Sequence, residues 1–225
     1  MKQTPVACVC FDIGGVLAHI AADWDEACDR ADQPRIDLPH DTNWQHRLDN
    51  AFIEYEAGRL RGLTDAAETF HTIVPTHSPD QLIAVIEAVI IRPSDASVPV
   101  VQQLRAAGIT TACLSNTNPL HWAILSEYQS IGLLDHHFLS FRIRAAKPEP
   151  AIYEYVEQHT GHAGPEVLFF DDKHENIAAA RDRGWRAQRI DPQADHAAQV
   201  TQHLQQHQVI ENGAVESALD YDAIG

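Results

Sequence analysis

The pattern of hydrophobic positions begins with an uninterrupted apolar run near the N-terminus. Residues 6–11 read VACVCF, and the run ends at Asp12, which is followed closely by Gly14 and Gly15. An apolar run without alternation is typical of a strand buried on both faces, as in the centre of a parallel sheet. Ligands bind at the carboxyl ends of such strands. We therefore expect Asp12 to lie at a binding site.

After residue 18 the apolar positions change to helical spacing. Trp44, Leu48, Phe52 and Tyr55 recur at intervals of three or four residues, and Gly58 follows as a helix stop signal. No strand pattern interrupts the segment, so it is predicted to be a small all-helical insertion. Two further helices are expected within it, at 66–73 and 82–91.

From residue 92 onward, helical and strand patterns alternate. Repeated strand and helix units predict a parallel sheet covered by helices, which is an α/β fold with a three-layer, Rossmann-like core. Residues 1–18 and 92–207 are expected to form this core, 19–91 a helical cap, and 208–225 an acidic tail. The expected strands of the second block are 109–114, 138–141, 167–170 and 185–190, and its helices include 119–132, 149–160 and 175–183.

The charge balance narrows the range of partners. The chain has 16 basic and 32 acidic residues and a formal net charge of −16. Such a charge repels nucleic acid and anionic membrane surfaces and favours a small molecule or a metal ion as partner. The sequence has no secretory signal pattern at its start and no apolar run of about 18 residues. We expect a soluble, cytoplasmic protein.

Polar residues follow the expected strands, and in a parallel sheet they converge on one edge. Each also has a structural explanation: a Ser-Asn-Thr turn can cap a helix, an Asp-x-x-Glu pattern can form a capping box, and a lysine in a loop is usually exposed. A carboxylate behind six apolar residues is costly to bury without a partner. The converging residues are Asp12, Ser115 with Asn116, Lys147, and Asp171 with Asp172.

Together these residue types supply what phosphoryl transfer requires. A carboxylate can act as a nucleophile and form an acyl phosphate. Carboxylate and carbonyl oxygens hold Mg²⁺, while a serine, a helix N-terminus and a lysine stabilise the oxygens of the transferred group. Asp12, Asp172, Ser115 and Lys147 cover those roles. The sequence therefore predicts a phosphoryl-transfer site.

The motifs FDIGGVL, LSNTN, AAKPEPAIY and FFDDKHENIAAA occur in this order, with a helical insertion after the first. In these motifs the chain resembles the haloacid dehalogenase superfamily, and LSNTNPLH and FFDDKHENI are most similar to its bacterial α-glucose-1-phosphate phosphatase group. The resemblance implies that Asp12 is the nucleophile and that Lys147 bridges the nucleophile and the phosphate. It also implies that Ser115 contacts the phosphoryl group, with Asn116 beside it.

The resemblance further implies a Mg²⁺ site. Asp12 and Asp172 would be ligands, Asp171 would bind the metal or orient a metal-bound water, and the backbone carbonyl of Gly14 would complete the site. Gly14 also marks a departure from the family. The usual motif is DxD, whose second aspartate protonates the leaving oxygen and then activates water, and such catalysis is typically worth about 10²–10⁴-fold.

A chain without that aspartate is slower, uses a leaving group that needs little protonation, or recruits another group. His19 and Asp23 are the substitutes suggested by sequence position. The cap is expected to close over the site and set specificity. Its candidates for ligand contact are Trp24, Trp44, His46, Tyr55, Glu56 and Arg59, and Trp122 in the core is a further one.

The resulting hypothesis is a Mg²⁺-dependent phosphatase that acts on a small phosphorylated metabolite, such as the sugar phosphate glucose 1-phosphate, through an aspartyl phosphate on Asp12. The alternative is a weak or inactive protein that binds a phosphorylated ligand or a protein partner, because Gly14 replaces the usual acid. Dehalogenation is disfavoured, since a metal-free site gains nothing from the crowded carboxylates of Asp171 and Asp172.

Overall fold

The computed structural model describes residues 4–94 and 96–211. Its centre is a parallel five-stranded sheet in the order β5-β4-β1-β6-β7. Strand β1 (Cys8–Phe11) lies in the middle, between β4 and β6, and all four of its residues are buried. The other strands of this sheet are β4 (Thr110–Ser115), β5 (His136–Leu139), β6 (Val167–Asp171) and β7 (Arg186–Arg189).

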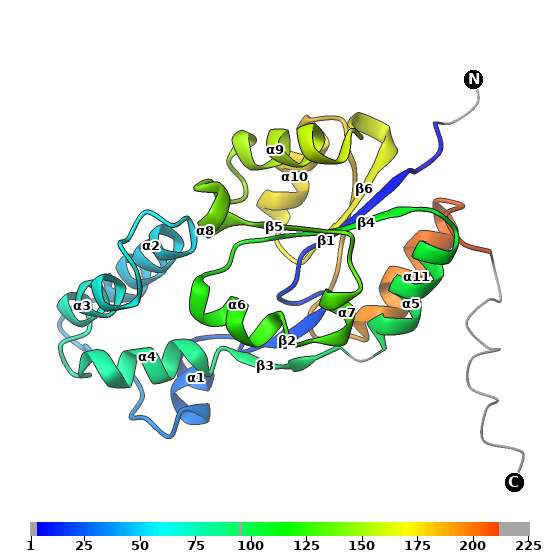
Figure 1. Ribbon diagram of the computed structural model, residues 1–225. Helices are drawn as coiled ribbons and strands as arrows, with labels where there is room; N and C mark the ends of the chain where they lie inside the picture. The colour runs from blue at the N-terminus through cyan, green and yellow to red at the C-terminus, as the bar shows by residue number, and fades with distance from the viewer. Residues whose placement is uncertain (1–3, 95, 212–225) are drawn as a thin grey trace, which may run out of the picture.

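Alternate residues of β1 enter two different hydrophobic clusters, because successive side chains of a strand point to opposite faces. Cys8 and Cys10 pack with apolar residues of α9 (Pro150–Thr160) and α10 (His174–Asp182). Val9 and Phe11 pack with α5 (Ser97–Ala106) and α11 (His196–Gln206) on the other face. The sheet is thus covered on both sides (Figure 1), which confirms the predicted three-layer α/β fold.

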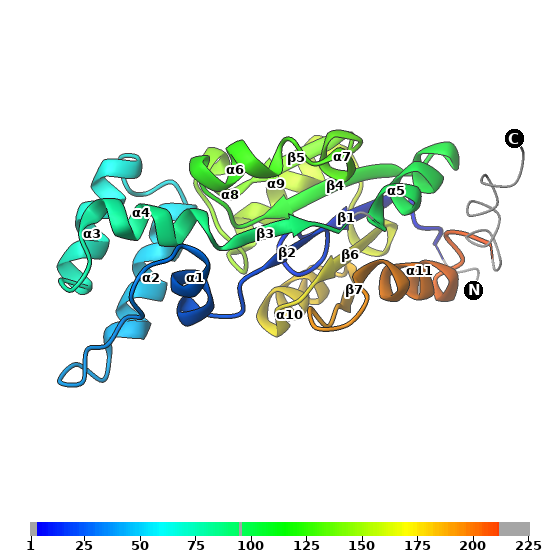
Figure 2. The same cartoon turned by 90° about the horizontal axis from the view of Figure 1, so that it is seen from below.

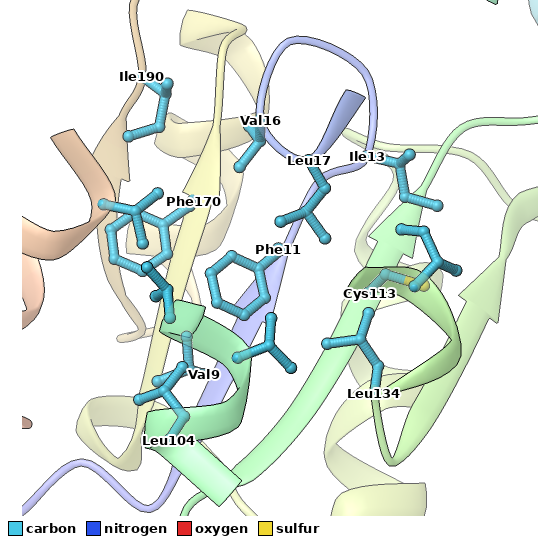
Figure 3. Close-up of a cluster of buried hydrophobic side chains, with 14 of the residues drawn as sticks. Val9, Phe11, Ile13, Val16, Leu17, Leu104, Cys113, Leu134, Phe170 and Ile190 are labelled. Carbon is cyan, nitrogen blue, oxygen red and sulfur yellow. The ribbon is translucent and has the colours of Figure 1, made fainter. Parts of the chain in front are cut away.

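The second cluster extends to the turn that leaves β1. Phe11 stacks on Phe170 of β6 with the ring centroids 5.6 Å apart. Ile13, Val16 and Leu17 continue from Phe11 into the same buried cluster (Figure 3). The apolar packing of these residues therefore holds the loop that carries Asp12 in place.

The helices of the insertion lie together beyond one end of the sheet (Figure 2). It has its own hydrophobic cluster, to which Leu48, Phe70 and Leu82 contribute. An insertion of helices was expected from the 3.6-residue spacing. Its helices are α1 (Trp24–Arg30), α2 (Trp44–Glu56), α3 (Leu63–Ile73) and α4 (Pro79–Glu87).

The prediction that residues 82–91 form one helix, with no strand in the insertion, was wrong at its C-terminal end. Helix α4 ends at Glu87, and β3 (Ile90–Pro93) pairs antiparallel with β2 (Ala18–Ile20). The β-branched pair Ile90–Ile91 favours a strand once a partner is available. The insertion is thus attached to the core through two paired strands, while the exact domain boundaries stay a prediction.

The expected helix over 119–132 is also interrupted. It consists of α6 (Pro119–Leu125) and α7 (Gln129–Gly132), because Tyr128 between them has an extended backbone. Strand β5 begins two residues earlier than expected and is followed directly by α8 (Ser140–Ile143). A 3₁₀ turn at Gly164–Glu166 leads into β6.

The predicted acidic tail lies almost entirely outside the described residues, which end at Glu211. None of the described helices combines the length and the apolar character needed to cross a bilayer. The cytoplasmic location stays a prediction.

Gly58 joins the insertion to the core and yields a test of this contact. It follows α2 with a φ of +67°, and a Cβ built on it would lie 2.4 Å from the backbone oxygen of Phe141 in α8. We expect Gly58→Ala to lower the free energy of unfolding by about 2–4 kcal/mol through left-handed strain and overpacking.

Gly108→Ala is the matched control for Gly58→Ala. Gly108 also stands one residue after an alanine C-cap and has a φ of +75°, but a Cβ there would meet no atom within 4 Å. We expect Gly108→Ala to lower the free energy of unfolding by about 1–2 kcal/mol, through left-handed strain alone. Equal losses of stability for the two variants, measured by urea denaturation, would contradict a close contact at Gly58.

Candidate active site

Asp12 is the first residue after β1 and lies on the carboxyl edge of the sheet. Its backbone nitrogen donates to the carbonyl oxygen of Phe170 at 2.7 Å, which sets it beside the end of β6. Its Oδ1 accepts a hydrogen bond from the nitrogen of Ile13 at 2.7 Å. The side chain is only 11% exposed. The carboxylate is therefore fixed by the strand and by its own turn.

Lys147 lies between two carboxylates. Its Nζ is 2.9 Å from Asp12 Oδ1 and 2.6 Å from Asp171 Oδ2, and its side chain is buried. Burial by itself lowers the pKa of the ammonium, but the charges of Asp12 and Asp171 outweigh burial and raise the pKa of Lys147 above its ordinary value. Lys147 is therefore a permanent cation in this site.

Asn116 positions Lys147 through the backbone. Its Nδ2 donates to the carbonyl oxygen of Lys147 at 2.9 Å, and its Oδ1 accepts from the nitrogen of Lys147 at 2.8 Å. This pair of bonds links the loop after β4 to the loop before α9. The predicted contact of Asn116 with substrate stays a prediction, whereas its role in placing Lys147 follows from these distances.

Asp171 is fully buried at the end of β6 and receives several hydrogen bonds. Asn176 Nδ2 donates to both carboxylate oxygens at 3.0 Å, and the backbone nitrogen of Lys173 donates to Oδ1 at 2.8 Å. Together with Lys147 these donors satisfy the carboxylate. Asp171 therefore orients the lysine as well as contributing charge.

Asp12, Asp171 and Asp172 bring carboxylate oxygens within 4.8 Å of one another. Gly15 makes room for this arrangement: its φ is +72°, and a Cβ on it would lie 3.1 Å from Cγ of Asp172. Burial, opposed by Lys147 and reinforced by the neighbouring acids, raises the pKa of Asp12 to about 7. Burial and Asp171 also raise the pKa of Asp172.

This donor set fits a divalent cation. Hard oxygen ligands from carboxylates are those that Mg²⁺ prefers. Burial first, and then the neighbouring acids, raise the pKa values of Asp12 and Asp172, and a bound cation would favour the ionised carboxylates. Acids that stand 160 positions apart in the sequence thus meet closely enough to share one ion.

A cavity of about 130 Å³ opens onto Asp12. Ser115 and Thr117 bring hydroxyls to its wall. Thr117 Oγ1 is buried without a hydrogen-bond partner, and Ser115 Oγ makes only a long contact of 3.4 Å with the carbonyl oxygen of Asn116. Ser115 Oγ is therefore available to an oxyanion, whereas Thr117 Oγ1 is buried beside it without a partner. The charged or polar residues around them are Glu56, Asn116, His121, Lys147, Asp172, Lys173 and Asn176.

Several of these residues were not predicted from the sequence to belong to the site. Lys173 directly follows FFDD and begins the turn into α10, so its place after the motif could have identified it as a site residue. Thr117 and His121 have no spacing that separates them from ordinary turn and helix residues. His121 donates from Nε2 to the carbonyl oxygen of Ile86 at 2.7 Å, and burial lowers its pKa.

The two substitutes suggested for the missing acid lie outside this cavity. His19 stacks on His196 with the ring centroids 4.5 Å apart and lines a separate hollow. Asp23 caps α1 by accepting a hydrogen bond from the nitrogen of Glu26. Among the cap residues suggested for ligand contact, Glu56 is the one that borders the cavity at Asp12.

The other residues suggested for ligand contact mainly make packing contacts, ion pairs or hydrogen bonds within the protein. Tyr55 is buried in the core of the insertion, and Trp44 packs against that core. Arg59 pairs with Glu54 and with Glu149, which precedes α9. His46 contacts Asn50, and Trp122 packs on the core cluster beside His137.

A second cavity, of about 410 Å³, adjoins the first and shares Phe52 and Val89 with it. Trp24 lines it, and Trp24 Nε1 donates to Asp49 Oδ1 at 2.8 Å. One face of α2 borders both cavities, because residues three or four apart share a helix face. The residues of that face are Gln45, Asp49, Phe52 and Glu56.

Comparison with known families decides the relationship. The model of a hydrolase family, the haloacid dehalogenase-like hydrolases, matches residues 6–184, which include β1, the insertion and β6. The chain belongs to the haloacid dehalogenase-like hydrolase family. This membership agrees with the motif resemblance and with the order of the site residues along the chain.

Similar members of the family include a curated relative, D-ribitol-5-phosphate phosphatase from Bacteroides thetaiotaomicron. It is 30% identical over 95 residues, and the match covers 39% of this chain and 46% of that protein. The matched region thus spans about half the length of the relative.

Solved structures of other family members share the fold. A haloacid dehalogenase family enzyme from B. thetaiotaomicron matches with a TM-score of 0.73 and 21% identity, over 88% of this chain and 99% of that one. The same enzyme has been solved with magnesium and inorganic phosphate. L-2-haloacid dehalogenase from Xanthobacter autotrophicus matches with a TM-score of 0.57 and 20% identity, over 85% and 80% of the two chains.

The crowded carboxylates predict a pH-dependent response to Mg²⁺. Groups with a raised pKa stabilise the fold at low pH, and this contribution is lost as the pH rises from about 4, the unfolded value for Asp, through the folded value of about 7 for Asp12. We expect 5 mM Mg²⁺ to raise the Tm more at pH 8 than at pH 5. This concentration saturates a site whose Kd is about 100-fold lower.

Asp172→Asn tests whether the cluster is responsible for that Tm shift. This variant should respond to Mg²⁺ much less than the wild type, whereas Asp182→Asn, on the exposed end of α10, should respond like the wild type. Differential scanning calorimetry with and without chelator measures both. An unchanged Mg²⁺ response in Asp172→Asn would exclude this cluster as the ion site.

Proposed function

We propose that this chain is a Mg²⁺-dependent phosphatase of the haloacid dehalogenase family, acting on a small phosphorylated metabolite through an aspartyl phosphate on Asp12. The observation that carries the proposal is the contact of Lys147 with Asp12 inside a cluster of three carboxylates, at a cavity that Ser115 also lines. A buried nucleophile held beside a fixed cation is suited to attack an anionic ester.

In the proposed reaction the Asp12 carboxylate attacks phosphorus, and the bond between phosphorus and the ester oxygen breaks. Lys147 offsets the charge of the nucleophile and of the phosphoryl oxygens near it. Ser115 donates a hydrogen bond to a phosphoryl oxygen, because it lines the cavity and its hydroxyl has no strong partner. Water then attacks the aspartyl phosphate and restores the carboxylate.

Asp12, Asp172 and the carbonyl of Gly14 would hold the Mg²⁺, with Asp171 behind them orienting Lys147 and the water shell of the ion. Bound there, the ion neutralises negative charge on the phosphoryl group and on the acids. The magnesium and phosphate in the related B. thetaiotaomicron structure support this assignment.

Dehalogenation is the rival activity within the same fold, and the similarity to the Xanthobacter dehalogenase shows only that the two share a fold. The carboxylate cluster supports the phosphatase instead. Attack on a carbon that carries a halide needs one carboxylate, whereas Asp172 adds a further acid to the cluster that a divalent cation would offset.

A sugar or sugar-alcohol phosphate is the proposed substrate class. The larger cavity has hydrogen-bonding groups on Asp23, Gln45 and Asp49 and an aromatic ring on Trp24, which suits a leaving group with several hydroxyls. The ribitol-phosphate activity that names the B. thetaiotaomicron relative points the same way. Glucose 1-phosphate, expected from the motifs, belongs to this class.

Phosphate release from a panel of sugar, sugar-alcohol and nucleotide monophosphates tests the activity. We expect Mg²⁺-dependent release that chelator abolishes and that Asp12→Asn reduces to background, because the nucleophile and a metal ligand are lost together. Malachite-green detection measures it. Equal turnover in chelator would refute the metal mechanism, and no turnover of any ester would favour a protein that only binds phosphorylated ligands.

Asp49→Ala tests the leaving-group cavity separately. We expect KM for ribitol 5-phosphate or glucose 1-phosphate to rise about tenfold, the loss of one charge-assisted hydrogen bond, with little change for p-nitrophenyl phosphate. Asp49→Asn keeps an acceptor for Trp24 and should lose less. A parallel rise in KM for the aryl ester would place Asp49 outside polyol recognition.

A further inference from the structure

The core of this site lacks the acid that the family uses two residues after the nucleophile. Gly14 occupies that position, and a Cβ built on it would lie 3.1 Å from Cδ1 of Ile20. The side chain of Ile20 therefore lies against the point where a second aspartate would begin. A proton donor for the leaving oxygen has to come from another part of the chain.

Most titratable groups described around the cavity already have a role. Asp12 and Asp172 belong to the carboxylate cluster, and Lys147 is held between two acids. His121 uses its Nε2 proton on the carbonyl oxygen of Ile86. Lys173 carries a positive charge at the start of α10 and faces the same space. Among these described residues, Glu56 is left.

Glu56 is the last residue of α2, and its backbone is fixed to the core. Ser140 Oγ donates to the carbonyl oxygen of Glu56 at 2.5 Å and accepts from the backbone nitrogen of Thr117 at 2.9 Å. Two residues later, Gly58 packs directly on Phe141. Ser140 therefore links the end of the cap helix to Thr117, in the loop that directly follows Ser115.

Glu56 lines the cavity, and no hydrogen bond or ion pair joins its carboxyl group to another described residue. Burial raises the pKa of Glu56 to about 8, with Lys173 and Lys147 opposing this and Asp12 adding to it. Glu54, two residues earlier in the same helix, instead pairs with Arg59 at the surface. Glu56 thus lines the same cavity as the nucleophile and has a raised pKa, and both properties suit a general acid.

We propose that Glu56, supplied by the cap helix, is the general acid and base of this hydrolase and replaces the aspartate missing at Gly14. The proposal rests on the phosphatase function proposed above. As Asp12 attacks phosphorus, Glu56 gives its proton to the leaving ester oxygen, which departs as an alcohol. The Glu56 carboxylate then takes a proton from water as the water oxygen attacks phosphorus, releasing inorganic phosphate and regenerating both residues.

Two esters with different leaving groups separate this role from a structural one. p-Nitrophenolate leaves without protonation, whereas the alkoxide of ribitol 5-phosphate needs a proton. In Glu56→Gln, the first turnover of p-nitrophenyl phosphate should stay within about tenfold of wild type, followed by a slow steady state with phosphorylated Asp12 accumulating. The first turnover of ribitol 5-phosphate should fall about 10²–10⁴-fold.

Glu54→Gln, on the same helix, is the matched control and should behave as wild type with both esters. Glu56→Asp should recover part of the loss for the alkyl ester, and the decline of kcat/KM above about pH 8 should be absent in Glu56→Gln. Quench-flow kinetics and acid-stable trapping of the phosphoenzyme measure these effects.

Equal loss of the first turnover with both esters in Glu56→Gln, or no loss with either, would overturn the assignment of Glu56 while leaving the phosphatase intact. Absence of turnover in the wild type would instead reject the proposed function itself. Orthovanadate binding to Glu56→Gln with wild-type affinity verifies that the variant keeps a folded phosphoryl site, and a loss of that binding would assign Glu56 a structural role.

Discussion

The site depends on one buried ammonium group. Lys147 Nζ lies within 3 Å of both Asp12 and Asp171, and the third acid, Asp172, lies in the same cluster. Without this cation the three acids would repel one another too strongly to remain ionised in a buried space. With it, the cluster still has more acids than the lysine can neutralise, and a divalent cation would offset that charge.

Much of the surrounding structure keeps the lysine in place. Asn116 holds its backbone from the loop after β4, and Asp171, itself fixed by Asn176, holds its ammonium group from the end of β6. These loops are neighbours only because β1 lies between β4 and β6 in a parallel sheet. The apolar packing of both sheet faces is therefore what brings charges from distant parts of the sequence to one point.

The sequence was sufficient to predict those elements whose patterns are local. The apolar run before Asp12, the alternating units after residue 92 and the position of Lys147 after a strand pattern predict the fold and the convergence of charges. The pairing of β2 with β3 was missed because Ile90 and Ile91 also fit the end of a helix, and only the partner strand decides between the two. Glu56 appeared as one of several cap residues, since the long-range contact of its backbone with Ser140, which holds the end of α2 at the core, leaves no local pattern.

Moving the acid from the core to the cap changes what limits the substrate. A site without an acid is slower or is restricted to leaving groups that need little protonation, and glucose 1-phosphate, expected from the motifs, agrees with that restriction. In the proposed mechanism that restriction disappears, because Glu56 can protonate an alkoxide. Gln45, Asp49 and Glu56 share one face of α2, so the helix that recognises the hydroxyls of the leaving group also delivers its proton. Substrate selection and proton transfer then depend on the same docking of α2 against α8, and a leaving group that fills the outer cavity is held where its ester oxygen meets the acid.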